Sequence, residues 1–252
     1  MPSAEFRCYG ELNDFLPLPQ RQRAFIYAFR VPGSVKDALE SLGVPHPEVD
    51  LLLVNGEPAG FDRVLADEDR VAAFPLFRHL DVSAVSPVHV PPLAEPRFAL
   101  DGHLGRLARY LRLLGFDAAH RPQADDTDLA NTAAAEDRIL LTRDLDLLKR
   151  RVVRRGYRVR NTDPHRQAVE VARQFGLTRL LSPFTRCLAC GERLTPATAE
   201  EIAGRVPEGV AARYATFHRC PGCGRVYWPG SHHRRLSLLV EEVRSGAGRP
   251  GP

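Results

Sequence analysis

The stretch RFALDGHLGRLARYLRLLGFD, residues 97 to 117, predicts the fold class of this chain. Four strand-forming residues run into Asp101, and a helix pattern with leucines on one face follows at once. The helix is expected over residues 103–114, with Gly115 as its stop, and FDAAH indicates a short second strand. A carboxylate stands where a buried strand meets a helix, and this position calls for a functional explanation.

The alternation of strands and helices continues after this stretch. DDTDLANTAAAED predicts a helix whose first turn is acidic, as the helix dipole favours. RILLTRD and YRVRN indicate two further strands, and DPHRQAVEVARQFG indicates another helix. Strands that alternate with helices predict an α/β domain with a parallel sheet covered on both faces.

Carboxylates occupy the strand and helix ends of this pattern. Asp101 and Asp144 end strands, Asp146 follows two residues later, and Asp125 and Asp126 open the helix after the second strand. Sites in open α/β sheets form outside the carboxyl ends of the strands. Clustered carboxylates repel one another unless cations lie between them, and oxygen ligands suit Mg²⁺ or Mn²⁺. We expect these carboxylates to bind such ions for phosphodiester chemistry. The alternative is that Asp101 is an N-cap and DDTD a charged first turn.

Four cysteines form two pairs with metal-ligand spacing. Cys187 and Cys190 lie in RCLAC, and Cys220 and Cys223 lie in RCPGC. Two C-x₂-C pairs suit a tetrahedral structural Zn²⁺ with no open position. We therefore expect this metal to serve folding or grip, and not to take part in the reaction. Disulfides are the alternative, which a reducing cytoplasm disfavours. Cys8 lies far away in sequence and is expected in the core.

The charge of the chain is segregated. Residues 1–95 carry 8 Lys or Arg against 14 Asp or Glu, whereas residues 96–252 carry 27 against 17. A basic part of this kind predicts a polyanion partner, and nucleic acid is the polyanion we expect. Only two of the basic residues are lysines, so a genome that favours arginine explains the choice of Arg but not its segregation.

Two basic segments are candidates for RNA binding. KRRVVRRGYRVR, residues 149–160, has seven basic residues in twelve, and VYWPGSHHRRL, residues 226–236, joins aromatic and basic side chains. Phosphates would contact the first, and bases of a single strand would stack in the second. The alternatives are a solvated face for the first segment and a packing role for Trp228. The expected RNA-binding residues are Arg150, Arg151, Arg154, Arg155, Trp228, Arg234 and Arg235.

The N-terminal part has the pattern of a small separate module. QRAFIYAFR indicates a strand, GSVKDALESLG a helix with Ser34 as N-cap, VDLLLVNGEPAG a strand with an Asn-Gly turn, and DRVAAFPLF a last strand. This order predicts a β-grasp (ubiquitin-like) module and is similar to the small sulphur-carrier proteins. Those carriers end in Gly-Gly, whereas this chain continues, so a docking role or a purely structural appendage is expected here.

In this order, DGHLGRLARYLRLLGFD, DDTDLA, RILLTRDLDLL and the paired cysteines resemble the Mut-7 C-terminal RNase family, a branch of the PIN-like nucleases, over roughly residues 97–235. GVPHPEVDLLLVNG and DRVAAFPLF resemble the ubiquitin-like domain often fused to that family. The resemblance implies a metal-dependent ribonuclease. By position Asp101 is its first acid, Asp126 or Asp125 the second, Asp144 the third and Asp146 a fourth.

The expected organisation has five parts. Residues 1–81 form the ubiquitin-like domain, 82–96 a Pro-rich linker, 97–182 the PIN-like nuclease domain, 183–236 a zinc ribbon, and 237–252 a helix end with a flexible tail. The expected activity is hydrolysis of RNA with catalytic Mg²⁺ or Mn²⁺ and structural Zn²⁺. The alternatives are a non-catalytic RNA-binding adaptor and a nuclease that acts on DNA. The ubiquitin-like domain would contact a protein partner. No run of about 18 apolar residues and no signal layout occur, so a cytoplasmic protein without membrane contact is expected.

Overall fold

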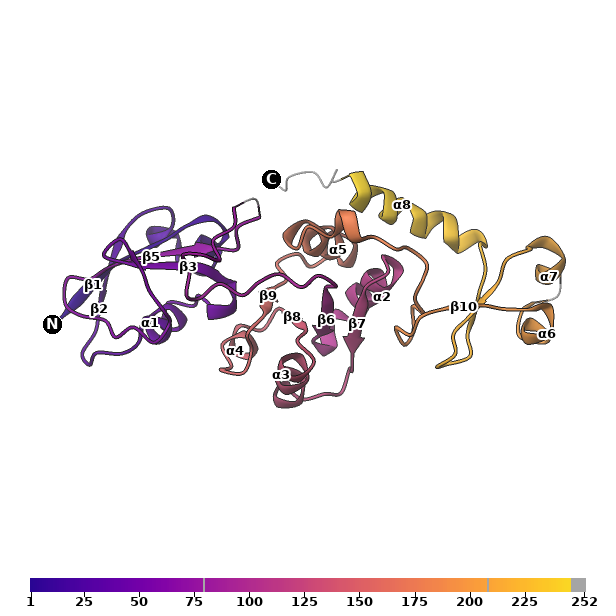
Figure 1. Ribbon diagram of the computed structural model, residues 1–252, viewed down its shortest axis with the longest axis horizontal. Helices are drawn as coiled ribbons and strands as arrows, with labels where there is room; N and C mark the ends of the chain where they lie inside the picture. The colour runs from indigo at the N-terminus through magenta and orange to yellow at the C-terminus, as the bar shows by residue number, and fades with distance from the viewer. Residues whose placement is uncertain (79, 208, 246–252) are drawn as a thin grey trace. The chain divides into compact units, whose positions relative to one another are not determined.

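The chain folds as two compact units. The structure, a computed structural model, describes residues 1–78, 80–207 and 209–245 (Figure 1). One unit comprises Met1–Ala94 and Asp126–Arg158, and the other comprises Glu95–Asp125 and Val159–Pro252. Part of the expected tail, residues 246–252, lies outside the described residues. Among the helices that are described, none has the length and apolar character needed to cross a membrane.

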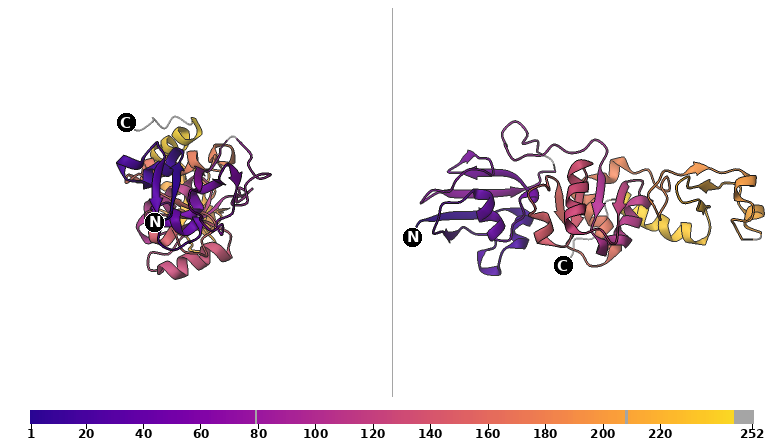
Figure 2. Two further views of the ribbon diagram at one scale, coloured as in Figure 1. Left: turned by 90° about the vertical axis from the view of Figure 1, so that its left-hand side faces the viewer. Right: turned by 90° about the horizontal axis from the view of Figure 1, so that it is seen from below.

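A five-stranded sheet forms the N-terminal part of the first unit. Its strands are β1 (Ser3–Cys8), β2 (Phe25–Ala28), β3 (Val49–Val54), β4 (Glu57–Pro58) and β5 (Arg70–Pro75), in the order β2-β1-β5-β3-β4. β1 pairs with β5 in parallel, and the other neighbours are antiparallel. The sequence prediction missed β1, although SAEFRC alternates polar and apolar residues and buries Ala4, Phe6 and Cys8. The sheet and the helix that packs on it confirm the ubiquitin-like fold (Figure 2).

Helix α1 (Val35–Ser41) begins as its sequence predicts. The Ser34 hydroxyl accepts a hydrogen bond from the Asp37 amide, and the Asp37 carboxylate bonds back to the Ser34 amide, which is a capping box. Its apolar face packs into the core of the sheet with side chains such as Phe6, Leu39 and Leu52. Cys8 is 2% exposed in this core, as expected, and burial raises the pKa of its thiol to about 12. Three short 3-10 helices complete the module: η1 (Gly10–Phe15), η2 (Leu18–Gln20) and η3 (His46–Glu48).

The Pro-rich segment 82–96 has no regular secondary structure, but it contacts the ubiquitin-like domain. Val82 and Val88 are buried. The Ser86 hydroxyl donates to the Asp50 carbonyl at 2.7 Å, and His89 Nδ1 lies 2.7 Å from Asp50 Oδ1. These contacts hold the segment against the end of β3.

Residues 126–158 complete the first unit. They form α3 (Asp126–Ala135), β8 (Ile139–Thr142), α4 (Leu145–Leu148) and β9 (Gly156–Arg158), and β8 pairs with β9 in parallel. This segment packs on the ubiquitin-like domain through η3. His46 Nε2 lies 2.9 Å from the Val153 carbonyl oxygen, and the Arg158 amide donates to the Glu48 carboxylate at 2.6 Å.

The second unit begins with the stretch that carries the opening pattern. β6 (Arg97–Leu100) is followed by η4 (Gly102–Leu104), α2 (Gly105–Leu113) and β7 (Asp117–His120), and β6 pairs with β7 in parallel. The parallel pairs β6/β7 and β8/β9 confirm the predicted α/β class. The remaining elements are α5 (Pro164–Gln174), η5 (Leu177–Leu180), β10 (Thr195–Pro196), α6 (Ala199–Ile202), α7 (Val210–Arg213), β11 (His218–Arg219), β12 (Val226–Tyr227) and α8 (Ser231–Ser245).

Gly115 ends α2 in a backbone conformation that other residues rarely adopt, with φ of +102°. The Gly115 and Phe116 amides return to the Arg112 and Leu111 carbonyls and satisfy the end of the helix. Residues 182–186 run along this helix end, because the Ser182 amide donates to the Leu114 carbonyl at 3.0 Å. The turn at Gly115 therefore joins α2 to the segment that leads into the cysteine pairs.

Candidate functional site

The two cysteine pairs lie on two turns of the same design. In the first, the Gly191 amide donates to the Cys187 carbonyl at 2.9 Å, and in the second the Gly224 amide donates to the Cys220 carbonyl at 2.9 Å. Both glycines have positive φ, +87° and +73°, which a residue with a side chain adopts only with strain. The repeat C-x-x-C-G in the sequence is the signal for this paired turn. Together with the sheet β10-β11-β12 the turns form a ribbon, residues 183–230.

The four cysteine sulfurs face one another. Their Sγ atoms all lie within 4.8 Å of each other, with Cys187 and Cys223 at 3.5 Å and Cys190 and Cys220 at 3.4 Å. All five cysteines of the chain are free thiols. Ligands at the usual Zn–S distance of about 2.3 Å stand about 3.8 Å apart in a tetrahedron. The set therefore fits a metal such as Zn²⁺, and it fits the predicted zinc ribbon.

The Tyr227 hydroxyl supports the first turn. It lies 3.1 Å from Cys187 Sγ and accepts a hydrogen bond from the Leu188 amide at 3.2 Å. Burial by itself raises the pKa of the Cys187 thiol, but hydrogen bonds from Tyr227 and from the Cys190 and Ala189 amides outweigh it and lower this pKa to about 6. A thiolate, the form that binds metal, is thus favoured at Cys187, whereas burial raises the pKa of the Cys190 thiol to about 12.

Arg112 fastens helix α2 to the same turn. Its side chain is buried and donates to the Ala118 carbonyl at 2.7 Å and to the Ala189 carbonyl at 2.7 Å. A Cβ on Gly191 would stand 3.1 Å from Arg112 Nε, so glycine makes room for the guanidinium. Burial lowers the pKa of Arg112, while the Cys190 and Cys187 thiols oppose that shift. The sequence analysis did not single out Arg112, although an arginine inside the apolar pattern LRLL was the available signal.

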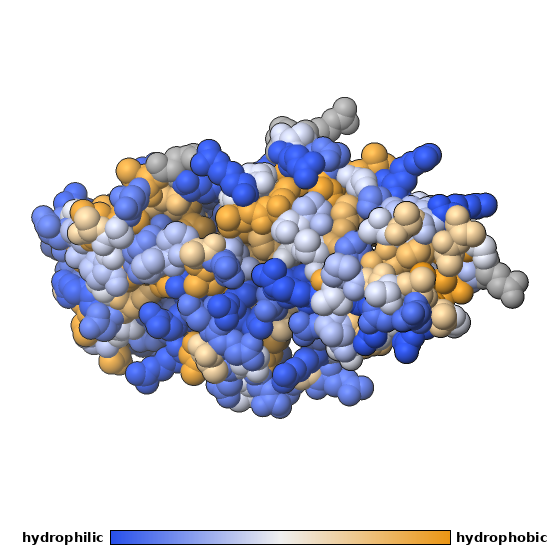
Figure 3. Space-filling view, turned by 45° about the vertical axis from the view of Figure 1, so that its right-hand side comes forward, coloured by the Kyte–Doolittle hydropathy of each residue, from blue (hydrophilic) through white to orange (hydrophobic). Residues whose placement is uncertain are grey.

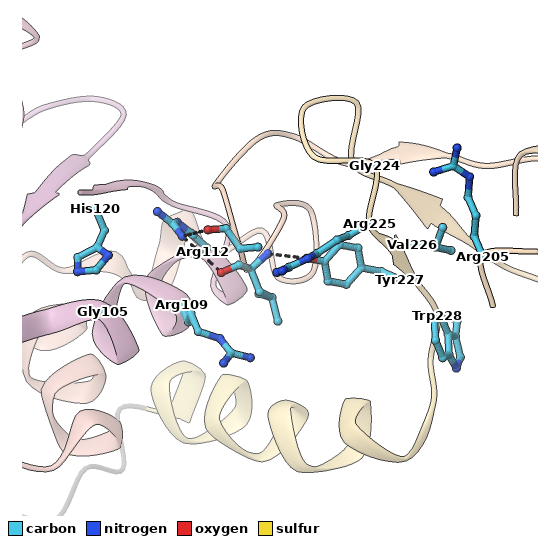
Figure 4. A pocket seen from close by; sticks show the side chains of 12 residues that line it. Gly105, Arg109, Arg112, His120, Arg205, Gly224, Arg225, Val226, Tyr227 and Trp228 are labelled. Atoms are coloured by element: carbon cyan, nitrogen blue, oxygen red, sulfur yellow. Dashed lines mark hydrogen bonds between the residues drawn. The ribbon is translucent and has the colours of Figure 1, made fainter. Parts of the chain in front are cut away.

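An open hollow of about 910 Å³ lies between α2 and the ribbon (Figure 4). We call it the basic hollow, because four arginines and a histidine line it and no carboxylate does. Figure 4 shows Arg109 extending from α2 into the space that Tyr227 and Trp228 border. Its lining residues are Gly105, Arg109, Arg112, His120, Leu188, Ala189, Arg205, Gly224, Arg225, Val226, Tyr227 and Trp228. Of these, the sequence had indicated Val226, Tyr227 and Trp228 within the segment 226–236, and only Trp228 was expected to bind RNA.

Asp101 ends β6, as expected, and it also caps the next turn. Its Oδ1 accepts a hydrogen bond from the His103 amide at 2.9 Å. His120, at the end of β7, lies with Nε2 3.1 Å from the Gly102 carbonyl oxygen. A Cβ on Gly105 would stand 2.9 Å from the His120 ring, so a glycine is required beside this histidine. Asp125 is exposed and lies after β7, just before α3.

Asp126, Asp144 and Asp146 belong to the first unit. Asp144 is the N-cap of α4, and its Oδ1 accepts from the Asp146 amide at 2.8 Å and the Leu147 amide at 3.4 Å. Asp126 is the first residue of α3, and its Oδ2 lies 3.9 Å from Arg150. All three aspartates are exposed. The N-cap alternative is therefore confirmed for Asp101 and Asp144.

The predicted RNA-binding arginines differ in how they are engaged. Arg150 donates to the Thr127 hydroxyl at 3.0 Å, and Arg155 pairs with Asp137 at 2.9 Å. Arg151 and Arg154 are exposed. Arg234 and Arg235 are exposed on α8.

Trp228 is half-buried, with its ring 6.4 Å from that of Phe217. The packing contact considered for it is therefore present, and the residue also lines the basic hollow. On the face that Figure 3 draws, hydrophilic side chains and hydrophobic patches lie side by side. Single exposed apolar residues such as Ile26 and Leu238 are ordinary on a protein surface.

Two family models match the chain. Residues 96–240 match the Mut7-C RNAse domain, and residues 1–81 match the Mut7-C ubiquitin domain. No curated protein matches it. Two crystal structures of the small archaeal modifier protein 1 of Haloferax volcanii are similar to 31% of this chain, at 23% and 24% identity, covering 100% and 99% of their own chains. Their TM-score is 0.25 in each case.

Proposed function

We propose that this chain, which belongs to the Mut7-C RNAse domain family, is a metal-dependent ribonuclease of the PIN-like class that hydrolyses phosphodiester bonds in RNA. The observation that carries the proposal is the match of residues 96–240 to an RNAse domain, because it covers the opening stretch, the aspartates and the cysteine pairs in one continuous span.

Carboxylates at strand and helix ends are the proposed catalytic residues. Asp101 and Asp144 follow β6 and β8, and Asp126 opens α3 with Asp125 directly before it. Carboxylate oxygens are the donors that Mg²⁺ and Mn²⁺ prefer. We assign Asp101, Asp126 and Asp144 to the cations, with Asp125 as the alternative second acid and Asp146 as an additional one.

When bound, Mg²⁺ or Mn²⁺ would supply Lewis acidity that lowers the pKa of water and stabilises the charge that develops on the phosphate. The protein would contribute the carboxylates that hold the cations. It would also contribute arginines that hold the RNA backbone, and Arg151 and Arg154 are exposed for this purpose.

The cysteine set is proposed to bind one structural Zn²⁺. Cys187, Cys190, Cys220 and Cys223 use all four positions of a tetrahedron, so no position is left for a reacting water. We place the protein in the cytoplasm, where thiols stay reduced and available to the metal. The ubiquitin-like domain is proposed to bind a protein partner.

Charge-only replacements test the carboxylates. Asp101→Asn and Asp144→Asn keep a side-chain oxygen for the observed capping bonds, and asparagine is as good an N-cap as aspartate. Folding should therefore survive while cation binding and cleavage are lost. Asp163→Asn is the matched control, because Asp163 caps α5 through a bond from the Arg166 amide and has no proposed catalytic role.

The assay is cleavage of RNA and of DNA of the same sequence with Mg²⁺ or Mn²⁺ and without either ion. We expect cleavage of RNA by the wild type and by Asp163→Asn, and at least a 100-fold loss in the other two variants, as for loss of one strong catalytic group. Wild-type rates in both would show that the active site has been misplaced. Cleavage of DNA alone would establish the alternative substrate, and binding of RNA without any cleavage would establish the adaptor.

A further inference from the structure

We propose that the basic hollow binds single-stranded RNA and holds the substrate of the proposed ribonuclease, on which this inference rests. The phosphates would contact Arg109, Arg205 and Arg225, and a base would stack on Trp228. These residues come from α2 and from the ribbon, so the hollow gives the ribbon a substrate-binding role beyond its metal.

The charge of the hollow is unopposed. Arg109, Arg205 and Arg225 are exposed, and among the described residues none of the three has a carboxylate oxygen within 4.0 Å. His120 adds a fourth polar group at the α2 end. Cations that lack partners attract phosphate, and binding of a polyanion at such sites is strengthened by counterion release.

Arg112 and Tyr227 also line the hollow, but their side chains are already engaged in hydrogen bonds within the protein. The Arg112 guanidinium is already bound to the Ala118 and Ala189 carbonyls, and the Tyr227 hydroxyl is held between Cys187 and Leu188. The Arg112 bonds join α2 to the ribbon, and the Tyr227 bonds hold β12 to the first cysteine turn within the ribbon. The wall of the hollow is therefore preorganised, and its three exposed arginines remain available to a ligand.

Trp228 gives the hollow a surface for a base. Phe217 packs against its ring, which is tilted by 46° to that of Phe217. A Cβ on Gly230 would stand 2.9 Å from Trp228 Nε1, so the glycine leaves room for the indole. An aromatic ring beside arginines is the arrangement that binds single strands, because unpaired bases stack on the ring while the backbone meets the charges. A duplex keeps its bases stacked inside and cannot use the ring in this way.

The open shape of the hollow, and not its size, favours an extended ligand. Its volume of about 910 Å³ is at the upper end of the ~300–1,000 Å³ typical of small-molecule pockets. It is also open, so a chain can enter and leave it. A short segment of a longer strand fits this shape better than an enclosed small molecule does.

Trp228 is the only tryptophan of the chain, so its fluorescence reports on the hollow directly. The experiment uses the full chain with Asp144→Asn, so that RNA is not consumed, and titrates it with oligouridylate, with the same length of oligodeoxythymidylate, and with duplex RNA. We expect the single strands to change the Trp228 fluorescence and to bind at least 10-fold more tightly than the duplex. No change in fluorescence on saturation with oligouridylate, or equal affinity for the duplex, would overturn the inference.

Variants of the exposed arginines complete the test. A phosphate contact on a single strand contributes about 0.7 to the log–log salt slope, which is about 4-fold in affinity at ~0.15 M salt. Arg109→Gln with Arg225→Gln should therefore weaken oligouridylate binding about 15-fold and flatten the slope by about 1.4. Arg179→Gln is the matched control, because Arg179 is exposed on η5 in the same unit and does not line the hollow.

The two proposals fail separately. Unchanged affinity in the double variant, with its zinc content intact, would overturn the binding role of the hollow whether or not the wild type cleaves RNA. Weakened binding and a flatter slope support it even if the wild type proves to be a non-cleaving RNA-binding protein. Both arginines are exposed, so their truncation leaves no buried gap, and the wild-type fluorescence titration does not depend on any variant of the hollow.

Discussion

Replacing Gly115 by alanine should destabilise the second unit more than any comparable glycine replacement in it. A Cβ at this position would stand 2.3 Å from the Ser182 carbonyl oxygen and 2.8 Å from its carbonyl carbon. Ser182 cannot retreat freely, because its amide bonds to Leu114 and its carbonyl accepts from the Thr185 hydroxyl at 2.6 Å. The clash therefore has to be relieved by moving the segment that leads into the cysteine ribbon.

The expected loss in the free energy of unfolding of Gly115→Ala has two parts. A residue with a side chain at positive φ costs about 1–2 kcal/mol, and overpacking a fixed neighbour costs a further ~1–3 kcal/mol. Gly176→Ala separates them, since Gly176 has φ of +61° and a Cβ there would meet nothing within 4 Å. Gly176→Ala should therefore lose only the free energy that a side chain at positive φ costs. We therefore expect Gly115→Ala to be less stable than Gly176→Ala by about 1–3 kcal/mol in the free energy of unfolding.

Thermal unfolding followed by Trp228 fluorescence measures this difference, because the one tryptophan lies in the ribbon of the same unit. At about 3 °C per kcal/mol for a unit of this size, Gly115→Ala should melt about 3–10 °C below Gly176→Ala. Equal midpoints would refute the reasoning, because they would mean that residues 182–186 do not lie against the end of α2 as described.

Three further predictions concern the metal, the arginine run and pH. Cys187→Ser should lose about one zinc per chain and leave the ribbon protease-sensitive, because metal binding and folding of such a site are one equilibrium. Cys8→Ala should keep its zinc, and metal analysis of reduced protein compares the two. Arg151→Gln with Arg154→Gln should flatten the salt dependence of RNA binding without loss of stability. Arg155→Gln should instead lower the stability of the first unit, since it breaks the pair with Asp137; salt titration and urea unfolding separate these results. Burial, reinforced by the Lys36 charge and opposed by Glu40, lowers the pKa of His46. The unfolded chain then binds the proton first, so the stability of the first unit should be full above about pH 6.5 and fall as the pH drops through the lowered pKa. His46→Gln should remove this loss, and a urea midpoint with the same acid dependence in that variant would contradict it.

Much of the local structure follows from residues close together in the chain. Ser34 with Asp37 predicts the start of α1, Asn55-Gly56 predicts the turn between β3 and β4, and Gly115 predicts the end of α2, as observed. These signals act within one turn of backbone, where capping bonds and the freedom of glycine decide the conformation. The C-x-x-C spacing likewise predicts the cysteine cluster, because a metal needs its ligands on two tight turns.

The parts that sequence reasoning missed depend on distant residues. β1 is a strand because β5, some 65 residues later, pairs with it in parallel. The Pro-rich segment lies against Asp50, which its composition does not predict. Arg155 has the same sequence signal as Arg154, but only Arg155 meets Asp137, so the two arginines have different roles.

The sequence by itself determined the classes of structure: a ubiquitin-like module, parallel α/β pairs and a four-cysteine cluster suited to a metal. Each rests on periodicity or spacing that a short segment contains. Only the tertiary structure decided which arginines are available. Arg112 lies in a helix with Arg109 three residues before it, yet Arg112 is buried on the carbonyls of the first cysteine turn and Arg109 is exposed in the basic hollow. The physical reason is that the local pattern sets the face a side chain lies on, whereas partners such as the Leu188 carbonyl of the first cysteine turn lie 76 positions away in the chain.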